Sequence, residues 1–479
     1  MNPLNPPRAQ QLLLTRREML RRAAGGFGAM ALAGLMADLQ ATETSLARRS
    51  DDDPLAPRTP HLAARAKSVI FIYLSGGVSH VDTFDPKPRL FSDSGKTMAV
   101  DNWQGRPGNY KFYLKKPQWD FKAGGQCGTE VSDLFPHMRG VVDDLCLIRS
   151  MRTDHTNHYE STLGMHTGSF NFARPSLGAW VSYGLGTENR NLPSFVVIAP
   201  QYPYAGTQTW ASDFLPGSHQ GTHILPGPVP IENIRPRAAT SLQRLELDLI
   251  ARANRQHLAA RPEEAALEAR IKSFETAFGM QSAAPEALDF SGESAATLKL
   301  YGLRRGQTSG FGWQCLAARR LTERGVRFIE LIDSGSANNW DSHGDMEAHA
   351  PLAKNVDQPI AGLITDLKQR GLLDDTLVVW TTEFGRTPYH EDKNAKGREH
   401  HHQVFSSWLA GGGVKRGIVY GASDETGSAV GENEVHVHDF HATILHLLGL
   451  DHEKLTYRHA GRDFRLTDVH GRVIKEILS

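Results

Sequence analysis

Short runs of apolar residues recur along the chain and alternate with segments of helical period. The clearest run is SVIFIYL at residues 68–74, which is apolar at consecutive positions and rich in β-branched residues. A strand buried on both faces of a sheet has this composition, because neither face meets water. Further runs predict strands within residues 141–149 and at 194–198, 325–332, 376–382 and 406–410.

Helical periods separate these strands. Helices are predicted around residues 313–323 and over 357–370, each leading into a strand. This alternation favours a doubly wound α/β fold, in which a mostly parallel sheet carries helices on both faces. Two segments interrupt it. Residues 241–280 predict an inserted helical pair that breaks near Pro262, and residues 86–130, rich in Gly, Pro, Lys and aromatics, predict a long excursion over the active face.

The N-terminal segment differs from the rest of the chain. Arg16 and Arg17 precede a weakly apolar, Gly- and Ala-rich run at residues 23–37 that is too short for a good membrane span. This pattern is typical of a twin-arginine export signal, and a chance basic helix is the alternative. We expect the twin-arginine export machinery to deliver a periplasmic or extracellular protein with no stable membrane span after processing. The expected order is a signal at 1–37, a flexible leader at 38–64 and one domain at 65–479, with insertions near 86–130 and 240–300.

Charge and cysteine content exclude some functions. Lys+Arg and Asp+Glu both number 53, so the chain has no net charge to attract nucleic acid. Its three cysteines, Cys127, Cys146 and Cys315, include no CxxC pair, which argues against a cysteine-based zinc site. Histidine is more informative, because 22 are present and many stand near carboxylates.

Carboxylates and imidazoles follow the predicted strands. In doubly wound sheets, ligands bind beyond the carboxyl ends of the strands. Glu383 directly follows one strand, and Asp82 follows the first strand and its glycine loop. Carboxylate and imidazole ligands suit a divalent ion such as zinc, manganese, calcium or iron. We therefore predict a metal site formed by Asp82, Asp341, His343, Glu383 and His400.

Each of these residues has an alternative interpretation. Asp82 can cap a turn before Pro86. Asp345 and His349 are four residues apart and can share a helix face, although Asp341 and His343 lie closer to the strand end. His158 begins a helix-like segment, where a helix cap with partly buried histidines is the alternative to a functional role.

Seven motifs in a fixed order give the chain a resemblance to a known family. They are GGVSHVDTFDPKP, NHYESTLGMHTG, NNWDSHGD, TTEFGRTP, GREHHH, LAGGGVKRGIVYGASDE and HDFHATILHLLGLD. With these motifs, residues 65–478 resemble the family named domain of unknown function 1501 (DUF1501), which is itself similar to the alkaline phosphatase and sulfatase superfamily. The resemblance implies an alkaline phosphatase-like α/β fold, a metal-dependent ester hydrolase site and, usually, a twin-arginine signal.

The chain departs from the sulfatase pattern at the catalytic positions. His158 stands where a sulfatase has its Cys or Ser nucleophile, and Thr162 replaces the arginine that follows it. Glu383 and Phe384 stand in place of a paired Asp and His that bind metal. The resemblance therefore implies the fold but not the mechanism.

The leading hypothesis is an exported, metal-dependent hydrolase of sulfate or phosphate esters that acts on a small-molecule or glycan ester. The metal would activate a water molecule, and His158 would be a general base, a nucleophile or a further ligand. Arg386 would hold the anionic group by bidentate hydrogen bonds. The alternative is a non-catalytic exported protein that binds a glycan or anion on a decayed hydrolase fold, which the missing nucleophile favours.

Overall fold

The computed structural model describes residues 54–103, 106–235, 240–261 and 265–479. The expected export signal, the leader up to residue 53 and the break at Pro262 lie outside the described residues. None of the helices within this part of the chain is long and apolar enough to cross a membrane.

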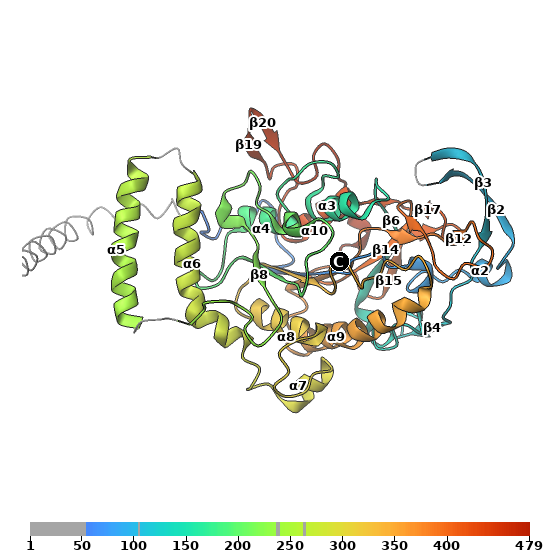
Figure 1. The fold of residues 1–479 in the computed structure, drawn as a ribbon, viewed down its shortest axis with the longest axis horizontal. Coiled ribbons are helices and arrows are strands. Elements are labelled where there is room, and N and C mark those ends of the chain that lie inside the picture. The colour runs from blue at the N-terminus through green and yellow to red at the C-terminus, as the bar shows by residue number, and fades with distance from the viewer. Residues whose placement is uncertain (1–53, 104–105, 236–239, 262–264) are drawn as a thin grey trace, which may run out of the picture. The chain divides into compact units, whose positions relative to one another are not determined.

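A mixed sheet forms the centre of the protein (Figure 1). Its strands run parallel to their neighbours, except that β14 is antiparallel to both β10 and β6. Nine strands of the described residues take part. In spatial order they are β15 (Ile418–Tyr420), β6 (Leu145–Arg152), β14 (Phe405–Gly411), β10 (Thr376–Thr381), β1 (Ser68–Tyr73), β9 (Phe328–Ile332), β7 (Phe195–Ile198) and β8 (Thr222–Ile224), with β18 (Val435–His436) also paired to β6.

Helices cover both faces of this sheet. On β1, Ile70 and Ile72 pack in one core cluster with residues of α8 (Phe311–Thr322) and α9 (His349–Gln369). Val69 and Phe71, which point the opposite way, pack with residues of α3 (His158–Thr167), α4 (Leu177–Leu185) and α10 (Val437–Leu447). Figure 1 shows these two sets of helices on opposite sides of the sheet. The doubly wound α/β fold predicted from the sequence is confirmed.

Strand positions agree with the apolar runs, whereas helix ends differ. All six runs contain a strand, and the run at residues 141–149 begins with a short 3-10 helix, η3 (Met138–Asp144). Helix α9 starts at His349 rather than at residue 357, and Pro359 lies inside it. The short strands β8, β15 and β18 gave no signal, because three residues or fewer cannot establish a period.

The predicted helical pair is present. Helix α5 (Thr240–Ala259) is followed by α6 (Ala265–Leu288) and by the shorter α7 (Ala295–Leu300). The C-terminal half of α6 joins the core through Met280, Ala284 and Ala287. Helix α5 lies outside α6, on the side away from the sheet (Figure 1).

Residues 86–130 are more regular than their composition indicated. After α2 (Pro88–Ser92), β2 (Thr97–Trp103) and β3 (Arg106–Leu114) form an antiparallel pair, to which β12 (Tyr389–His390) adds a third strand. Val100, Phe112 and Tyr389 pack together and anchor this small sheet. A second pair, β4 (Phe121–Gly124) and β5 (Thr129–Ser132), follows.

The remaining described elements are short. They are β11 (Gly385–Arg386), β13 (His400–His401), β16 (Ala422–Ser423), β17 (Val430–Glu432), β19 (Tyr457–His459), β20 (Arg462–Phe464), η2 (His80–Asp82), η4 (Gly206–Trp210), η5 (Gly217–His219), η6 (Met346–Ala348) and η7 (Lys475–Ile477). The described end of the expected leader is also attached: Arg58 N donates to Leu185 O, and Leu62 N donates to Gly449 O. These bonds hold the described end of the leader against the ends of α4 and α10.

Candidate metal centre

Three neighbouring parallel strands end at the same edge of the sheet. Tyr73, the last residue of β1, pairs with Thr381 of β10 and Ile332 of β9. The loops that follow these strands therefore meet, as expected at the carboxyl edge of a doubly wound sheet. They carry most of the polar residues that the sequence singled out.

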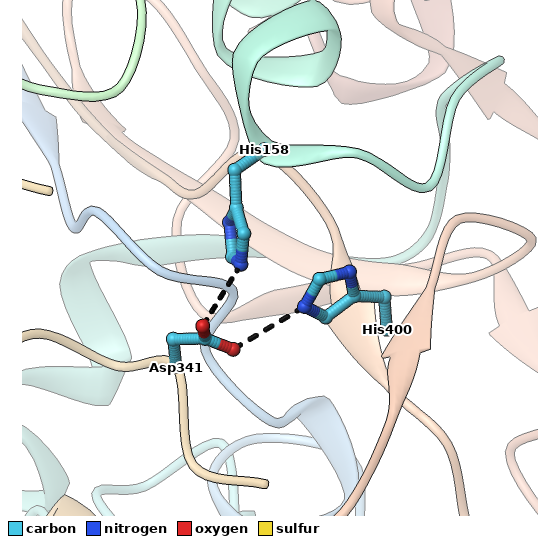
Figure 2. A group of neighbouring side chains, drawn as sticks. All are labelled: His158, Asp341 and His400. Carbon is cyan, nitrogen blue, oxygen red and sulfur yellow. Dashed lines mark hydrogen bonds and ion pairs between the residues drawn. The ribbon is translucent and has the colours of Figure 1, made fainter.

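Two histidines and an aspartate converge at this edge. His158 is the first residue of α3, Asp341 lies in the loop after β9, and His400 is the first residue of β13, which pairs with β11. Figure 2 shows the carboxylate of Asp341 between the two imidazoles. Asp341 Oδ2 lies 3.3 Å from His158 Nε2, and Oδ1 lies 3.2 Å from His400 Nε2. One ligand atom from each residue lies within 4.8 Å of the other two, so the group is compact enough to hold a metal ion.

Helix α3 presents His158 because the helix begins there. Asn157 caps the helix, and its side chain accepts a hydrogen bond from Tyr159 N at 3.0 Å. The imidazole of His158 then stacks on Tyr204, with ring centroids 4.1 Å apart and planes inclined by 11°. Phe384 packs against His158 and His400, with ring centroids 4.8 and 4.6 Å away. Two aromatic walls therefore limit the orientations of both imidazoles.

Glu383 orients His158 and is not itself available to an ion. Its Oε1 accepts from His158 Nδ1 at 2.7 Å and from Gly76 N at 2.8 Å. Its Oε2 accepts from Tyr73 Oη at 2.9 Å and from Thr382 Oγ1 at 3.0 Å. The side chain is fully buried, and although burial opposes its charge, the bond to His158 outweighs that effect and keeps the pKa of Glu383 below its usual value. Protein donors occupy both oxygens of Glu383, so the structure places this carboxylate behind His158.

The other two histidines of the site are oriented in the same way. His400 Nδ1 lies 2.7 Å from Thr156 O, and a carbonyl oxygen can only accept, so Nδ1 carries a proton. His343 Nδ1 lies 3.0 Å from Glu399 Oε2. In each neutral imidazole the proton on Nδ1 leaves a lone pair on Nε2.

The Nε2 atoms of the three histidines converge on the carboxylate of Asp341. His343 Nε2 lies 3.0 Å from His400 Nε2 and 2.8 Å from Asp341 Oδ1. His158 Nε2 is buried, lies off the line of a hydrogen bond to Asp341 and has no hydrogen-bond partner among the described residues. Electron pairs at such separations repel one another unless a proton or a metal cation lies between them. Neutral imidazole and carboxylate are the ligands that zinc, iron and manganese accept.

A proton on His343 is the competing source of positive charge. Hydrogen bonds to Asp341 and Glu399 raise the pKa of His343 to about 9. Burial opposes the charge of Asp341, but polar contacts with His158, His343 and His400 outweigh it and hold the pKa of that carboxyl well below its usual range. His343 is also the most exposed of the four side chains, at 41% against 26% for Asp341. It therefore closes the solvent side of the group, either as a fourth ligand or as an imidazolium.

Arg386 does not reach outward to an anion. Its guanidinium is completely buried, with Nε bonded to Gly77 O at 2.9 Å and Nη1 to Arg398 O at 3.2 Å. Its Nη2 donates to Gly76 O and, at 2.6 Å, to Asp341 Oδ1. All three nitrogens of Arg386 bond within the protein, where they hold Asp341 and the loop after β1, and its role in holding a substrate group stays a prediction.

Asp82 lies in a separate buried pair. Its Oδ2 accepts from Arg398 Nε at 2.7 Å and from Ser79 Oγ at 2.5 Å, and its Oδ1 accepts from Gln118 N at 3.3 Å. Both side chains of the Asp82–Arg398 pair are almost completely buried. The structure therefore does not bring Asp82 to the other predicted ligands, because its carboxylate forms a buried ion pair with the guanidinium of Arg398 instead.

The alternative candidates also have structural partners. Asp345 accepts from Glu347 N and caps η6, while His349 is buried and bonds to Ser342 Oγ at 3.0 Å. The helix-face pairing of Asp345 with His349 is therefore not formed. His166 pairs with Glu330 at 2.8 Å inside the core. This leaves His158, Asp341, His343 and His400 as the predicted residues that the structure brings together.

Sequence reasoning missed three residues that support this group. Tyr73 donates to Glu383, Tyr204 stacks on His158, and Glu399 bonds to His343. Glu399 precedes His400 directly, so a carboxylate beside the histidine run was a usable signal. Tyr73 and Tyr204 gave none, since tyrosine in an apolar strand or a loop is ordinary.

The comparisons with known proteins show the family of the chain. Residues 66–478 match the family described as "Protein of unknown function (DUF1501)". No curated protein matches the chain. One solved structure similar to the chain is the lipoteichoic acid synthase LtaP from Listeria monocytogenes, with 9% identity over 87% of this chain and 79% of that one and a TM-score of 0.36. Another is the PsFucS1 sulfatase from Pseudoalteromonas sp., with 12% identity over 83% of this chain and 69% of that one and a TM-score of 0.34. A third is an alkaline phosphatase from the Antarctic bacterium TAB5, with 11% identity over 73% of this chain and 92% of that one and a TM-score of 0.30. At these TM-scores the likenesses carry no argument about substrate or activity.

Proposed function

Because the chain belongs to the DUF1501 family of proteins of unknown function, its activity has to be argued from its own site, and we propose an exported, metal-dependent hydrolase of sulfate or phosphate esters. The observation that carries the proposal is the convergence of three imidazole Nε2 atoms on one carboxylate, with His158 Nε2 lacking a hydrogen-bond partner among the described residues. Export rests on the twin-arginine pattern at Arg16 and Arg17.

In this proposal His158, Asp341 and His400 hold a single divalent ion, and His343 completes the set. Zinc, iron and manganese fit the ligands better than calcium, which prefers a shell of oxygen atoms. Such an ion would polarise an ester oxygen and lower the pKa of a water molecule to near neutrality. Glu383, Glu399 and Thr156 O hold the three imidazoles in the tautomer that binds metal.

The geometry favours metal binding over nucleophilic attack as the role of His158. Its Nδ1 is bonded to Glu383 and its Nε2 points into the cluster, so neither nitrogen faces outward to a substrate. Among the described residues, no cysteine belongs to this group of possible ligands. Water is therefore the proposed nucleophile, and the substrate enters past Asp341 and His343, the more exposed members of the group.

The test is metal content measured together with ester hydrolysis. We expect about one zinc, iron or manganese per chain by elemental analysis, and hydrolysis of aryl phosphate or aryl sulfate esters that is lost in Asp341→Asn and His400→Ala. Asp345→Asn is the matched control, because this nearby acid caps η6 and lies outside the cluster. Hydrolysis that persists in Asp341→Asn would overturn the proposed site.

The second candidate function is metal-independent binding of a glycan or anion. The specific observation in its favour is His343, which the pKa of about 9 makes a cation at neutral pH without any metal. A protein that contains no stoichiometric metal, hydrolyses neither class of ester and binds a sulfated glycan would support this candidate over the hydrolase.

A further inference from the structure

Helix α5 carries a stripe of exposed leucines. Leu242, Leu245 and Leu249 are 52, 67 and 56% exposed. Their spacings of three and four residues place them on one side of the helix. Ala253 continues the same line and is also exposed. A stripe with this spacing is the seam by which one helix pairs with another.

The opposite side of α5 already has a partner. Gln243, Leu247, Ala251, Asn254 and Leu258 are half-buried where α5 packs against α6. Figure 1 shows α6 between α5 and the central sheet. The leucine stripe therefore points away from the sheet, and packing of α5 on α6 does not account for it.

We propose that the leucine stripe binds the leucine stripe of a second copy of this chain, with the two α5 helices antiparallel. Each copy then contributes the α5–α6 hairpin to a bundle of four helices, an arrangement in which two-helix hairpins bury their outer apolar faces. The two-fold axis passes near Leu249, so that Leu249 packs on Leu249 of the partner subunit. This inference does not depend on the proposed hydrolase activity.

Charge along α5 supports an antiparallel pair. Arg244, Glu246 and Asp248 give its first half a net charge of −1, whereas Arg252 and Arg255 give its second half a net charge of +2. Antiparallel pairing sets the acidic half of one copy against the basic half of the other, which is favourable in both directions because the axis is two-fold. An anionic membrane would attract the basic half but repel Glu246 and Asp248, so the mixed charge favours a protein partner over a lipid surface.

The length of the leucine stripe sets the affinity that we expect for the dimer. A helix of 20 residues is about 30 Å long, and two such helices bury an area at the lower end of specific interfaces. We therefore expect a reversible dimer whose fraction rises with protein concentration.

Sedimentation velocity of the purified full chain over a hundredfold range of concentration tests the proposal. We expect the weight-average mass to rise toward twice the monomer mass, and the Leu245→Glu/Leu249→Glu variant to remain monomeric throughout. Val469→Glu is the matched control, because Val469 is 71% exposed at a distant position in the chain, and it should dimerise as the wild type does. A monomeric wild type, or a double variant that still dimerises, would overturn the proposal.

Cross-linking fixes the register. With the exposed Cys127 changed to serine, Leu249→Cys should form a disulfide-linked dimer on mild oxidation, while Val469→Cys should not. Two further results would count against a second copy as the occupant. One is a wild type that becomes dimeric only after residues 1–53 are removed, and the other is a monomer whose leucines are needed for binding to phosphatidylglycerol vesicles.

Discussion

Glu383 accepts the Nδ1 proton of His158 at 2.7 Å, and this bond links the end of β10 to the start of α3. The carboxylate is buried and is also held by Gly76 N and Tyr73 Oη. A carboxylate behind a histidine fixes its tautomer and raises the basicity of the nitrogen that faces the metal. The relationship gives Glu383 a role that its position in the sequence did not reveal.

Replacing Glu383 should weaken metal binding without removing a ligand. Glu383→Gln keeps the size of the side chain but loses the charge that supports His158, so we expect the metal affinity to fall about 10- to 100-fold. Competition with a fluorescent chelator measures it. Glu330→Gln is the matched control, because Glu330 pairs with His166 of the same helix outside the cluster. An equal loss in both variants would contradict the assignment.

The ligands themselves should differ in importance. We expect Asp341→Asn and His400→Ala to abolish stoichiometric metal, because each removes a ligand from the compact group of three. His343→Ala should retain metal at reduced affinity, since His343 lies on the solvent side and can be replaced by water. Elemental analysis after gel filtration distinguishes the two results. If His343→Ala loses metal as completely as Asp341→Asn, then His343 belongs to the essential set.

The Asp82–Arg398 pair should matter for stability rather than for metal content. Asp82→Ala leaves the buried guanidinium of Arg398 without its charged partner, and breaking a buried pair in this way costs about 3–5 kcal/mol of unfolding free energy. Urea unfolding measures this loss. The exposed Lys67–Asp375 pair supplies the control, and Asp375→Ala should leave the urea midpoint unchanged. Loss of metal from a folded Asp82→Ala protein would restore Asp82 as a ligand.

Arg386 should behave as a positioning residue. Arg386→Gln removes the donor to Asp341 and the bonds to Gly76 O and Gly77 O, so we expect lower metal affinity together with a loss of roughly 3 kcal/mol in stability. Chelator competition and urea unfolding measure the two effects. Arg416→Gln, which breaks an exposed pair with Asp374, is the control. A variant that keeps its metal and only raises KM for anionic esters would show that Arg386 contacts the substrate.

The strands were predictable because burial on both faces leaves a continuous apolar run, as in β1 and β10. The same rule located the site, since parallel strands end at one edge. It could not say which polar residue beyond a strand faces the proposed metal ion. Asp82 and Glu383 both follow strands, but Arg398 and His158, which are distant in sequence, occupy their oxygens. Such pairings depend on the tertiary structure and leave no local pattern.

Two buried histidines outside the site should make stability depend on pH. Burial lowers the pKa of His219 and of His441 to about 3, and each ring leaves one nitrogen without a hydrogen-bond partner among the described residues. In the unfolded chain their pKa is about 6.5. Between these values the unfolded state binds protons that the folded state does not, so stability is complete above pH 6.5 and is lost as the pH falls toward 3.

The free energy of unfolding should fall by about 1.4 kcal/mol per pH unit for each histidine, and by about 3 kcal/mol per pH unit for the two together. Urea unfolding at pH 7.5, 6.5, 5.5 and 5.0 measures the slope, and the range ends before most carboxylates titrate. His219→Gln keeps a polar partner for Ser182 but cannot take up a proton, so it should lower the slope by about 1.4 kcal/mol per pH unit. A slope that is the same in the wild type and in His219→Gln would show that His219 already binds its proton in the folded protein.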